Sequence, residues 1–304
     1  MNKISIQEVA TRDGLQIEEQ FVPTDQKVDL VNRLGAAGVD KIEVTSFVSP
    51  KAVPNLKDAE EVMQHIERKE GVTYTALIPN VKGAERALAC EADEVNLVAS
   101  VSETHNLKNV RQKVDDSFAN FKDIASFLSG SGIDINGTLA TTFGCPFEGS
   151  ISEDRVMTLI DQYLELGAGG ITLADTTGMA TPNQVFRLCG KVLDKWPDLP
   201  LTLHFHNTRG MGLANVVEGI RAGVTRFDAS LGGLGGCPFA PGATGNICTE
   251  DLVHMLAFMG YDMKADLDQL IAISKHMEKE VVKHEVPGQI IKAGKITDLH
   301  EARS

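Results

Sequence analysis

Short apolar runs alternate along this chain with longer segments in which apolar residues recur at helical spacing. Each short run predicts a buried β-strand, and each longer segment predicts a helix. The predicted strands cover residues 4–9, 41–47, 73–78, 94–100, 133–142, 170–175, 199–206 and 226–231. The strict alternation of the two patterns indicates repeated βα units, and therefore a parallel sheet.

The segment 156–164 shows the helical pattern most clearly. Its apolar residues recur at intervals of three and four, which is the stripe of a helix that lies against a sheet. The residues of this stripe are Val156, Leu159, Ile160, Tyr163 and Leu164.

Two other segments carry signals for helix ends. Thr181 and Pro182 predict a helix start, with Thr181 as the N-cap and Pro182 at the first helical position. Residues 30–34 mark the helix after the first strand, which Gly35 and Gly38 are expected to close.

Eight strands that alternate with helices are typical of a (β/α)₈ TIM barrel. A doubly wound open sheet is the alternative, but it usually carries a Gly-rich fingerprint after its first strand. Here the first strand runs into Thr11-Arg12-Asp13-Gly14, which lacks that pattern, so the barrel is favoured. Further helices near 250–259 and 266–284 predict a C-terminal helical extension. We therefore expect one barrel domain over residues 1–285 and a polar C-terminal tail over 286–304.

Composition and charge are those of an ordinary globular protein. Of the 304 residues, 42% are hydrophobic and 23% are charged, so the chain can bury a large core. The net charge of −13 disfavours nucleic acid and anionic membranes as partners. No apolar run reaches the ~20 residues of a membrane span. Five scattered cysteines without a Cys-x-x-Cys pair predict reduced thiols and a cytoplasmic location.

The end of the seventh predicted strand carries the strongest chemical signal. Side chains alternate between the two faces of a strand, so His204 and His206 point to the same side. Two imidazoles aimed at one place make either a metal site or a catalytic pair.

A barrel places its functional residues at the C-terminal ends of its strands and in the loops that follow. This rule brings Asp13, from the end of the first strand, next to His204 and His206. One carboxylate and two imidazoles with open positions suit a catalytic metal, and Asn246 could add an amide oxygen. Such a set favours Mg²⁺ or Mn²⁺ over sulfur-loving metals, although zinc is compatible with these residue types.

Polar residues follow the other strands too, so the rim is predicted to be polar all round. The further rim candidates are Arg12, Gln16, Glu43, Asn80, Ser102, Thr142 and Asp175. The loop 232–246 contains six glycines and has three interpretations: a phosphate cradle, a flexible linker, or a mobile flap that carries Cys237. Cys145 is the alternative thiol on the same rim.

Four motifs together resemble the 3-hydroxy-3-methylglutaryl-CoA (HMG-CoA) lyase family. The motifs are TRDGLQ at 11–16, IEVTSFVSPK at 42–51, HFH at 204–206 and GLGGCP at 233–238. The similarity extends from about residue 4 to residue 275. The family belongs to the barrel metallolyases, which also include isopropylmalate and homocitrate synthases. The GLGGCP loop is typical of the lyase branch, whereas the His-x-His strand end is shared across the superfamily.

The resemblance implies retro-Claisen cleavage of HMG-CoA into acetyl-CoA and acetoacetate, as in leucine degradation and ketone-body formation. An acyl-CoA thioester is then the small-molecule partner, and a homodimer or higher homo-oligomer is expected. The family's ligands of Mg²⁺ or Mn²⁺ fall on Asp13, His204, His206 and Asn246.

Catalytic roles follow from the same resemblance. The proton of the substrate hydroxyl would go to Asp13 or His204. Arg12 would stabilise the enolate, and Cys237 would protonate the acetyl-CoA carbanion. The other assigned residues are Glu43, which would orient Arg12 or a metal ligand, and Gln16 and Asp175, which would bind substrate.

The chain departs from the family pattern at Ile17, Glu19 and Asn207, which lie on the rim and leave the acyl group open. A related 3-hydroxyacyl-CoA such as citramalyl-CoA is an alternative substrate. A Claisen-condensing enzyme or an aldolase of the same superfamily is an alternative activity. A barrel that only binds an acyl-CoA is the non-catalytic alternative.

Overall fold

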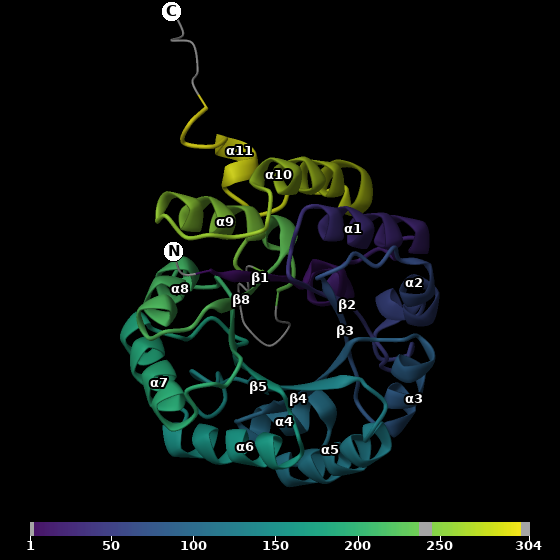
Figure 1. Cartoon of the computed structure of the whole chain (residues 1–304), viewed down its shortest axis with the longest axis vertical. Helices are drawn as coiled ribbons and strands as arrows, with labels where there is room; N and C mark the ends of the chain where they lie inside the picture. Colours follow the sequence, from purple (N-terminus) through teal and green to yellow (C-terminus); the bar gives the residue numbers. More distant parts are fainter. Residues whose placement is uncertain (1–2, 237–244, 299–304) are drawn as a thin grey trace, which may run out of the picture.

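The structure is a computed structural model that describes residues 3–236 and 245–298. Eight parallel strands close into a barrel in sequence order, and β8 pairs with β1. Helices surround the barrel, as Figure 1 shows. The predicted (β/α)₈ barrel is confirmed, and the doubly wound sheet is excluded.

The strands fall within the predicted runs. They are β1 (Ser5–Glu8), β2 (Lys41–Ser46), β3 (Thr73–Leu77), β4 (Glu94–Ser100), β5 (Asp134–Ala140), β6 (Gly170–Asp175), β7 (Leu201–Phe205) and β8 (Arg226–Ala229). β4 and β6 have the predicted bounds, whereas the other strands are shorter. Some residues outside these bounds still hydrogen-bond to the neighbouring strand, such as the amides of Val9 to Ala229 and of Phe47 to Leu77. Periodicity along the sequence does not fix the exact ends of a strand.

Helices separate the strands and continue beyond β8. They are α1 (Thr24–Ala36), α2 (Ala59–His65), α3 (Val81–Ala89), α4 (Glu103–Val110), α5 (Val114–Leu128), α6 (Glu153–Glu165), α7 (Pro182–Lys195), α8 (Gly212–Arg221), α9 (Thr249–Phe258), α10 (Leu267–His276) and α11 (Ile290–Ala293). None of the helices in the described ranges is long and apolar enough to cross a membrane.

α6 packs on β5 through the predicted apolar stripe. Tyr163 is fully buried and lies over Gly137, where a Cβ atom would be only 2.5 Å from the aromatic ring. The Tyr163 hydroxyl donates to the carbonyl oxygens of Leu97 (2.9 Å) and Thr138 (3.1 Å). Glycine at 137 therefore lets the helix approach the sheet closely. The buried Tyr163 hydroxyl has its hydrogen-bonding requirement met by the two carbonyl oxygens.

One predicted helix end differs from the structure, and another lacks the expected capping hydrogen bond. α1 continues through Gly35, because this glycine allows close packing: a Cβ atom there would lie 3.0 Å from the Tyr74 hydroxyl. Gly38 follows the helix with a φ of +83°. α7 begins at Pro182 as predicted, but among the described residues the Thr181 side chain makes no capping hydrogen bond.

The C-terminal extension begins with α9 and α10, which lie beside each other above α1 and β1 in Figure 1. The helix predicted over 266–284 stops at His276 and continues as the π-helical segment Met277–Val282. The short helix α11 follows, and Val286 and Ile291 are buried against this extension. Part of the segment after residue 285 therefore packs on the barrel's helical cover.

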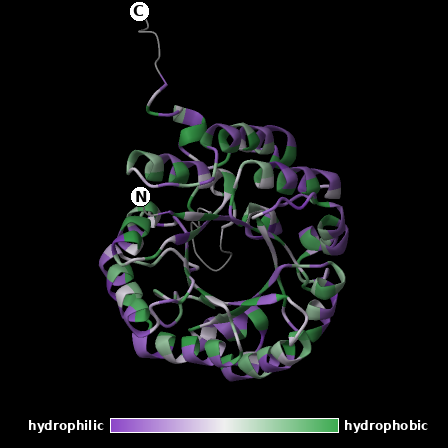
Figure 2. Cartoon of the chain, in the orientation of Figure 1, coloured by the Kyte–Doolittle hydropathy of each residue, from purple (hydrophilic) through white to green (hydrophobic). Residues whose placement is uncertain are grey.

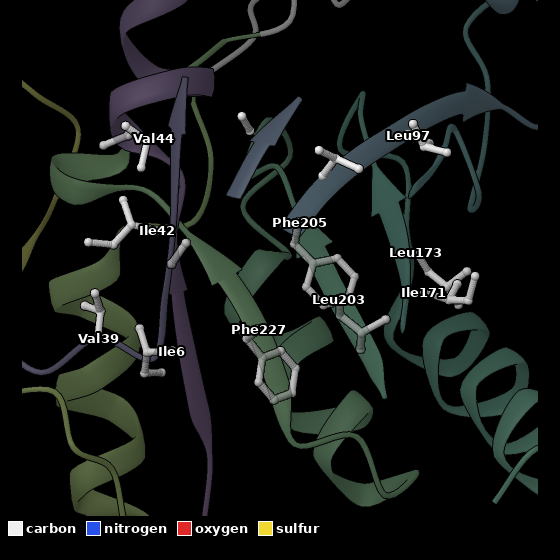
Figure 3. Close-up of a cluster of buried hydrophobic side chains, with 14 of the residues drawn as sticks. Ile6, Val39, Ile42, Val44, Leu97, Ile171, Leu173, Leu203, Phe205 and Phe227 are labelled. Carbon is white, nitrogen blue, oxygen red and sulfur yellow. The ribbon is translucent and has the colours of Figure 1, made fainter. Parts of the chain in front are cut away.

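The barrel wall has an apolar outer face and a polar inner face. The apolar residues, which alternate with polar ones along the strands, are buried between strands and helices (Figure 3) and include Ile6, Ile42, Leu97, Ile171, Leu173, Leu203 and Phe227. Hydrogen bonds across the interior identify the inner face, because they join strands that are not neighbours, such as Gln7 to Thr202 and Asn96 to Glu43. Figure 2 shows that apolar and polar residues also alternate along the helices around the barrel.

Candidate active site

Asp13, His204 and His206 meet at the C-terminal ends of β1 and β7, and all three are buried. Their ligand atoms lie within 4.8 Å of one another. The two histidine Nε2 atoms are 3.2 Å apart, and Nε2 of His206 is 3.8 Å from Oδ2 of Asp13. The convergence expected from the rim of a barrel is therefore present.

Local backbone structure explains how these side chains reach one place. β1 runs into the π-helical turn Ala10–Gly14, in which the carbonyl oxygen of Val9 accepts from the amides of Arg12, Asp13 and Gly14. This turn directs Asp13 over the barrel mouth. His204 lies in β7 and His206 directly follows it, so strand alternation points both imidazoles inward.

Asn246 reaches the cluster because its backbone pairs with the end of β7. An antiparallel bridge joins His206 and Asn246, and the amide of Ile247 donates to the carbonyl oxygen of Phe205 at 3.0 Å. Nδ2 of Asn246 donates to Oδ2 of Asp13 at 2.7 Å. Oδ1 of Asn246 is buried and has no hydrogen-bond partner among the described residues.

The cluster fits a divalent cation. An oxygen acceptor without a donor, beside two imidazoles and a carboxylate, is an arrangement that a cation satisfies and that a purely structural core does not explain. Asp13, His204, His206 and Asn246 would supply two nitrogen and two oxygen ligands. This donor set suits Mg²⁺ or Mn²⁺.

Arg12 lies next to the cluster and is held by two carboxylates. Its guanidinium is 2.5 Å from Oε2 of Glu43 and 2.7 Å from Oδ1 of Asp13. Burial alone would lower the pKa of Arg12, but Glu43 and Asp13 outweigh it and raise the pKa. Gln16 donates to Oδ1 of Asp13 at 3.0 Å, so in this structure it contacts a candidate ligand.

The two histidines have pKa values shifted in opposite directions. Burial, followed by the repulsion of His204, lowers the pKa of His206 to about 4. Burial also acts to lower the pKa of His204, but the hydrogen bond and charge of Asp228 raise it. Burial would raise the pKa of Asp13, which Arg12 and the histidines instead lower. His206 and Asp13 are therefore in the unprotonated forms that bind metals at neutral pH.

Asp228 also lies in the candidate site, although the sequence did not predict it there. Its Oδ2 lies 3.0 Å from Nδ1 of His204. A carboxylate in this position holds the Nδ1 proton and leaves Nε2 of His204 free to act as a ligand. Asp228 lies in β8 between two apolar residues, so strand alternation places its carboxylate on the inner face of the barrel. This alternation, next to the strand that carries the His-x-His pair, could have predicted the contact.

Several rim candidates make local structural contacts. Oδ1 of Asp175 accepts from the amides of Met179 and Ala180, and burial raises the Asp175 pKa to about 6. Asn80 and Ser102 cap α3 and α4 through their side chains. Polar strand ends at the rim therefore include ordinary helix caps as well as residues of the candidate site.

The four described cysteines are buried. Cys237 lies outside the described residues. Cys145, the alternative thiol, is fully buried and donates to the Ser102 hydroxyl at 3.0 Å. The other described cysteines, Cys90, Cys189 and Cys248, are also buried and unpaired by disulfides.

The glycine-rich loop begins directly on the ligand cluster. Gly235 has a φ of +97°, and a Cβ atom there would lie 2.6 Å from Nδ2 of Asn246 and 3.0 Å from Oδ2 of Asp13. Only glycine permits this conformation and this approach. Residues 237–244 of the predicted flap lie outside the described ranges.

Two buried carboxyl groups hold the start and the return of this loop. Glu8 accepts from the Leu231 amide at 2.9 Å and from the Thr249 hydroxyl at 2.7 Å. Glu250 accepts from the Gly232 amide at 3.0 Å. Burial raises the pKa of Glu8 to about 7 and also raises that of Glu250. Neither residue was predicted from the sequence, because neither lies in a motif.

The whole barrel, and not only its rim, matches a known family. The HMGL-like family profile matches residues 3–277, which include all eight strands and the candidate ligands. The chain belongs to the HMGL-like family.

Its relatives include lyases for two acyl-CoA substrates. Hydroxymethylglutaryl-CoA lyase YngG of Bacillus subtilis is 41% identical over 281 residues, which is 92% of this chain and 94% of the relative. (R)-citramalyl-CoA lyase of Chloroflexus aurantiacus is 40% identical over 306 residues, covering 97% of this chain and 96% of the relative.

A solved structure resembles this member of the HMGL-like family over nearly its full length. It is an HMG-CoA lyase from Acinetobacter baumannii in complex with coenzyme A and 3-methylmalate. The identity is 55%, the TM-score is 0.95, and the match covers 99% of this chain and 98% of the other.

Proposed function

We propose that this chain is a divalent-metal-dependent carbon–carbon lyase that cleaves HMG-CoA into acetyl-CoA and acetoacetate. The observation that carries the proposal is the cluster of Asp13, His204, His206 and Asn246, with Arg12 beside it, at the mouth of an HMGL-like barrel. A carbon–carbon cleavage next to a thioester needs a way to deprotonate a hydroxyl and a way to stabilise an enolate. These residues supply both.

Asp13, His204, His206 and Asn246 would hold Mg²⁺ or Mn²⁺. When bound, such an ion acts as a Lewis acid that lowers the pKa of the substrate's tertiary hydroxyl and orients it. Asp228 would keep His204 in the tautomer that this role requires. Gln16 would help to orient the Asp13 carboxylate by donating to its Oδ1 atom.

Proton transfer and charge stabilisation would fall to the chain's own side chains. Asp13 or His204 would take the hydroxyl proton, after which the bond between Cα and Cβ breaks and charge moves to the thioester oxygen. Arg12 would stabilise this enolate oxygen, since its guanidinium is fixed by Glu43 and Asp13 and needs no rearrangement.

Cys237 would protonate the acetyl-CoA carbanion from the glycine-rich loop, an assignment that depends on the GLGGCP motif. Closure of that loop would keep water from the enolate. Asp175 remains a proposed substrate-binding residue, since one of its carboxylate oxygens has no hydrogen-bond partner among the described residues.

Citramalyl-CoA is the second candidate substrate. The (R)-citramalyl-CoA lyase of Chloroflexus aurantiacus covers as much of this chain as the HMG-CoA lyases do. The same chemistry on citramalyl-CoA would release acetyl-CoA and pyruvate in place of acetoacetate. The choice between the substrates depends on the acyl pocket and not on the ligand cluster.

The test is a panel of 3-hydroxyacyl-CoA thioesters, including HMG-CoA and citramalyl-CoA, with Mg²⁺ or Mn²⁺ added. Release of acetyl-CoA and of acetoacetate or pyruvate is measured separately. We expect HMG-CoA to have the highest kcat/KM, EDTA to abolish turnover, and Mg²⁺ or Mn²⁺ to restore it. Full turnover by metal-free protein would contradict the metal's role, and no cleavage of any thioester would contradict the lyase function.

The proposal also includes the protein's setting. We propose a cytoplasmic enzyme that assembles as a homodimer or higher homo-oligomer and takes an acyl-CoA thioester as its partner, without nucleic acid or membrane. With HMG-CoA as substrate, its place would be leucine degradation and the formation of acetoacetate as a ketone body.

A further inference from the structure

Side-chain hydrogen bonds cross the barrel interior and end at Arg12. Nδ2 of Asn136 donates to Oγ1 of Thr172 at 3.0 Å and to Oδ1 of Asn96 at 3.1 Å. Nδ2 of Asn96 then donates to Oε1 of Glu43 at 3.0 Å, and the other Glu43 oxygen accepts from Arg12. The chain of contacts thus runs from β6 through β5 and β4 to β2, and from there to the rim.

The orientation of the Asn96 amide is determined by its neighbours. Oδ1 of Asn96 accepts from Oγ1 of Thr138 at 2.6 Å as well as from Asn136. With two donors on the oxygen, the NH₂ end of Asn96 must face Glu43. An oxygen in that place would repel the Glu43 carboxylate.

Glu43 has a different partner on each carboxylate oxygen. Arg12 occupies Oε2 and Asn96 occupies Oε1, so the carboxylate cannot rotate without losing one hydrogen bond. β2 and β4 are separated by β3, so this contact reaches across the interior and not along the sheet. Glu43 is buried, which makes each of its hydrogen bonds more valuable than a surface contact.

We propose that Asn96 is a positioning residue that acts on Arg12 through Glu43. By fixing the Glu43 carboxylate from the far side, Asn96 holds the guanidinium in the place where the enolate oxygen forms. This inference rests on the proposed role of Arg12 in the lyase reaction. The contact itself can be tested separately from that role.

The informative variants keep the size of residue 96 and change its hydrogen bonding. Asn96→Leu removes the donor, and Asn96→Asp presents an acceptor to Glu43 in a nearly identical shape. Glu94→Gln is the matched control, because Glu94 also lies in β4 and contacts β2, through Lys41 at 2.6 Å, but does not contact Glu43. All three are assayed as the full chain with Mg²⁺ and the best thioester of the panel.

We expect Asn96→Leu to lower kcat roughly tenfold or more, the scale found for residues that orient functional groups from outside the site. Asn96→Asp should lower kcat further, because a carboxylate would displace Glu43 from its hydrogen bond. KM for the thioester should stay within about twofold, since Asn96 does not contact the rim cluster. Glu94→Gln should keep the wild-type kcat.

A second readout follows Arg12 without any turnover. The Nε–H group of Arg12 donates to Glu43 in a buried place, so its ¹⁵N NMR signal should exchange slowly with water and should shift or broaden in Asn96→Leu. Arg12→Lys identifies the signal by its absence. Glu94→Gln should leave this signal unchanged.

Wild-type kcat in Asn96→Leu, or an equal loss in Glu94→Gln, would overturn the inference. An unchanged Arg12 signal in Asn96→Leu would overturn it as well, whatever the activity. If the wild-type protein cleaves no thioester, the proposed function fails, while the NMR comparison still decides whether Asn96 positions Arg12.

Discussion

Along β7, Leu203 and Phe205 lie in the apolar layer beneath the helices, whereas Thr202 and His204 face the barrel interior. Neighbouring residues of one strand therefore belong to different environments. The outer positions are apolar and buried by helices (Figure 3). The inner positions are polar and hydrogen-bonded to residues of other strands.

The outer face of the barrel wall mainly stabilises the fold, whereas the inner face mainly positions the side chains that carry the chemistry. Apolar area buried under the helices stabilises the fold by about 25 cal/mol per Å², without directional requirements. Buried polar groups cost free energy unless they are paired, so the inner face has to be built as a connected set of hydrogen bonds. The same connections aim side chains at the rim. We therefore expect inner substitutions that break contacts leading to the rim residues to change activity or metal binding, and outer substitutions to change the free energy of unfolding.

Glu8 is an exception to this division. It alternates with the inward-facing Gln7 and so lies on the outer side of β1, buried beneath the C-terminal extension. Its carboxyl group joins the amide of Leu231 to the hydroxyl of Thr249. One polar group on the outer face thus connects the barrel to both ends of the glycine-rich loop.

The largest expected effect is on the inner side, at Arg12. Arg12→Gln should raise the activation barrier by about 3–4 kcal/mol, the scale for removing a group that stabilises an oxyanion. The loss should appear in kcat per folded molecule, while the melting temperature should also fall because Glu43 and Asp13 lose a buried partner. Arg209→Gln is the control, since Arg209 is also a rim arginine but its hydrogen bonds among the described residues go to the carbonyl oxygens of Thr177 and Gly178. An effect confined to KM would instead make Arg12 a substrate anchor.

On the outer side, Ile171→Ala should lower the free energy of unfolding by about 3 kcal/mol, because it leaves a cavity in the fully buried layer. Ile171→Val should cost about 1 kcal/mol. Denaturant unfolding measures both. Turnover per folded molecule should match the wild type, and a specific loss of kcat in Ile171→Ala would show that the two faces are not independent.

Glu8 should make stability depend on pH. Burial raises its pKa from 4.5 to about 7, so the folded chain keeps a proton that the unfolded chain loses. The corresponding stabilisation is complete below about pH 4.5 and is lost as the pH rises to about 7, with an upper limit of about 3 kcal/mol.

Glu8→Gln, which stays neutral, should flatten the decline in unfolding free energy across this range. Urea unfolding at several pH values measures the slope. The exposed Glu70→Gln serves as the control and should keep the wild-type slope. An identical slope in Glu8→Gln would mean that Glu8 does not hold its proton in the folded chain.

The smallest expected effect concerns Asp228. Asp228→Asn should weaken Mn²⁺ binding roughly 10–100-fold, because His204 loses the carboxylate that fixes its tautomer. Calorimetric titration measures the affinity. Thr202→Val, which removes another inner hydrogen bond, should bind Mn²⁺ as the wild type does. Equal affinities for Asp228→Asn and the wild type would remove Asp228 from the metal site.

Periodicity along the sequence was enough to establish the barrel and one side of the candidate site. The alternation of strands follows from local patterns of apolar residues, and β4 and β6 even have the predicted bounds. The common direction of His204 and His206 is equally local, because side chains two apart in a strand share a face. The rule that barrel strands end at one rim then brought Asp13 to them.

Only the tertiary structure decided which polar residues support this site. Asn246 reaches Asp13 through a backbone bridge to His206, and Asp228 and Asn96 each contact a side chain from another strand. The pKa of His206 falls while that of His204 rises, although the two residues are only two positions apart in the sequence. Hydrogen bonds and pKa shifts depend on distances between residues far apart in the chain. A pattern read along the chain contains the strand periodicity but not those distances.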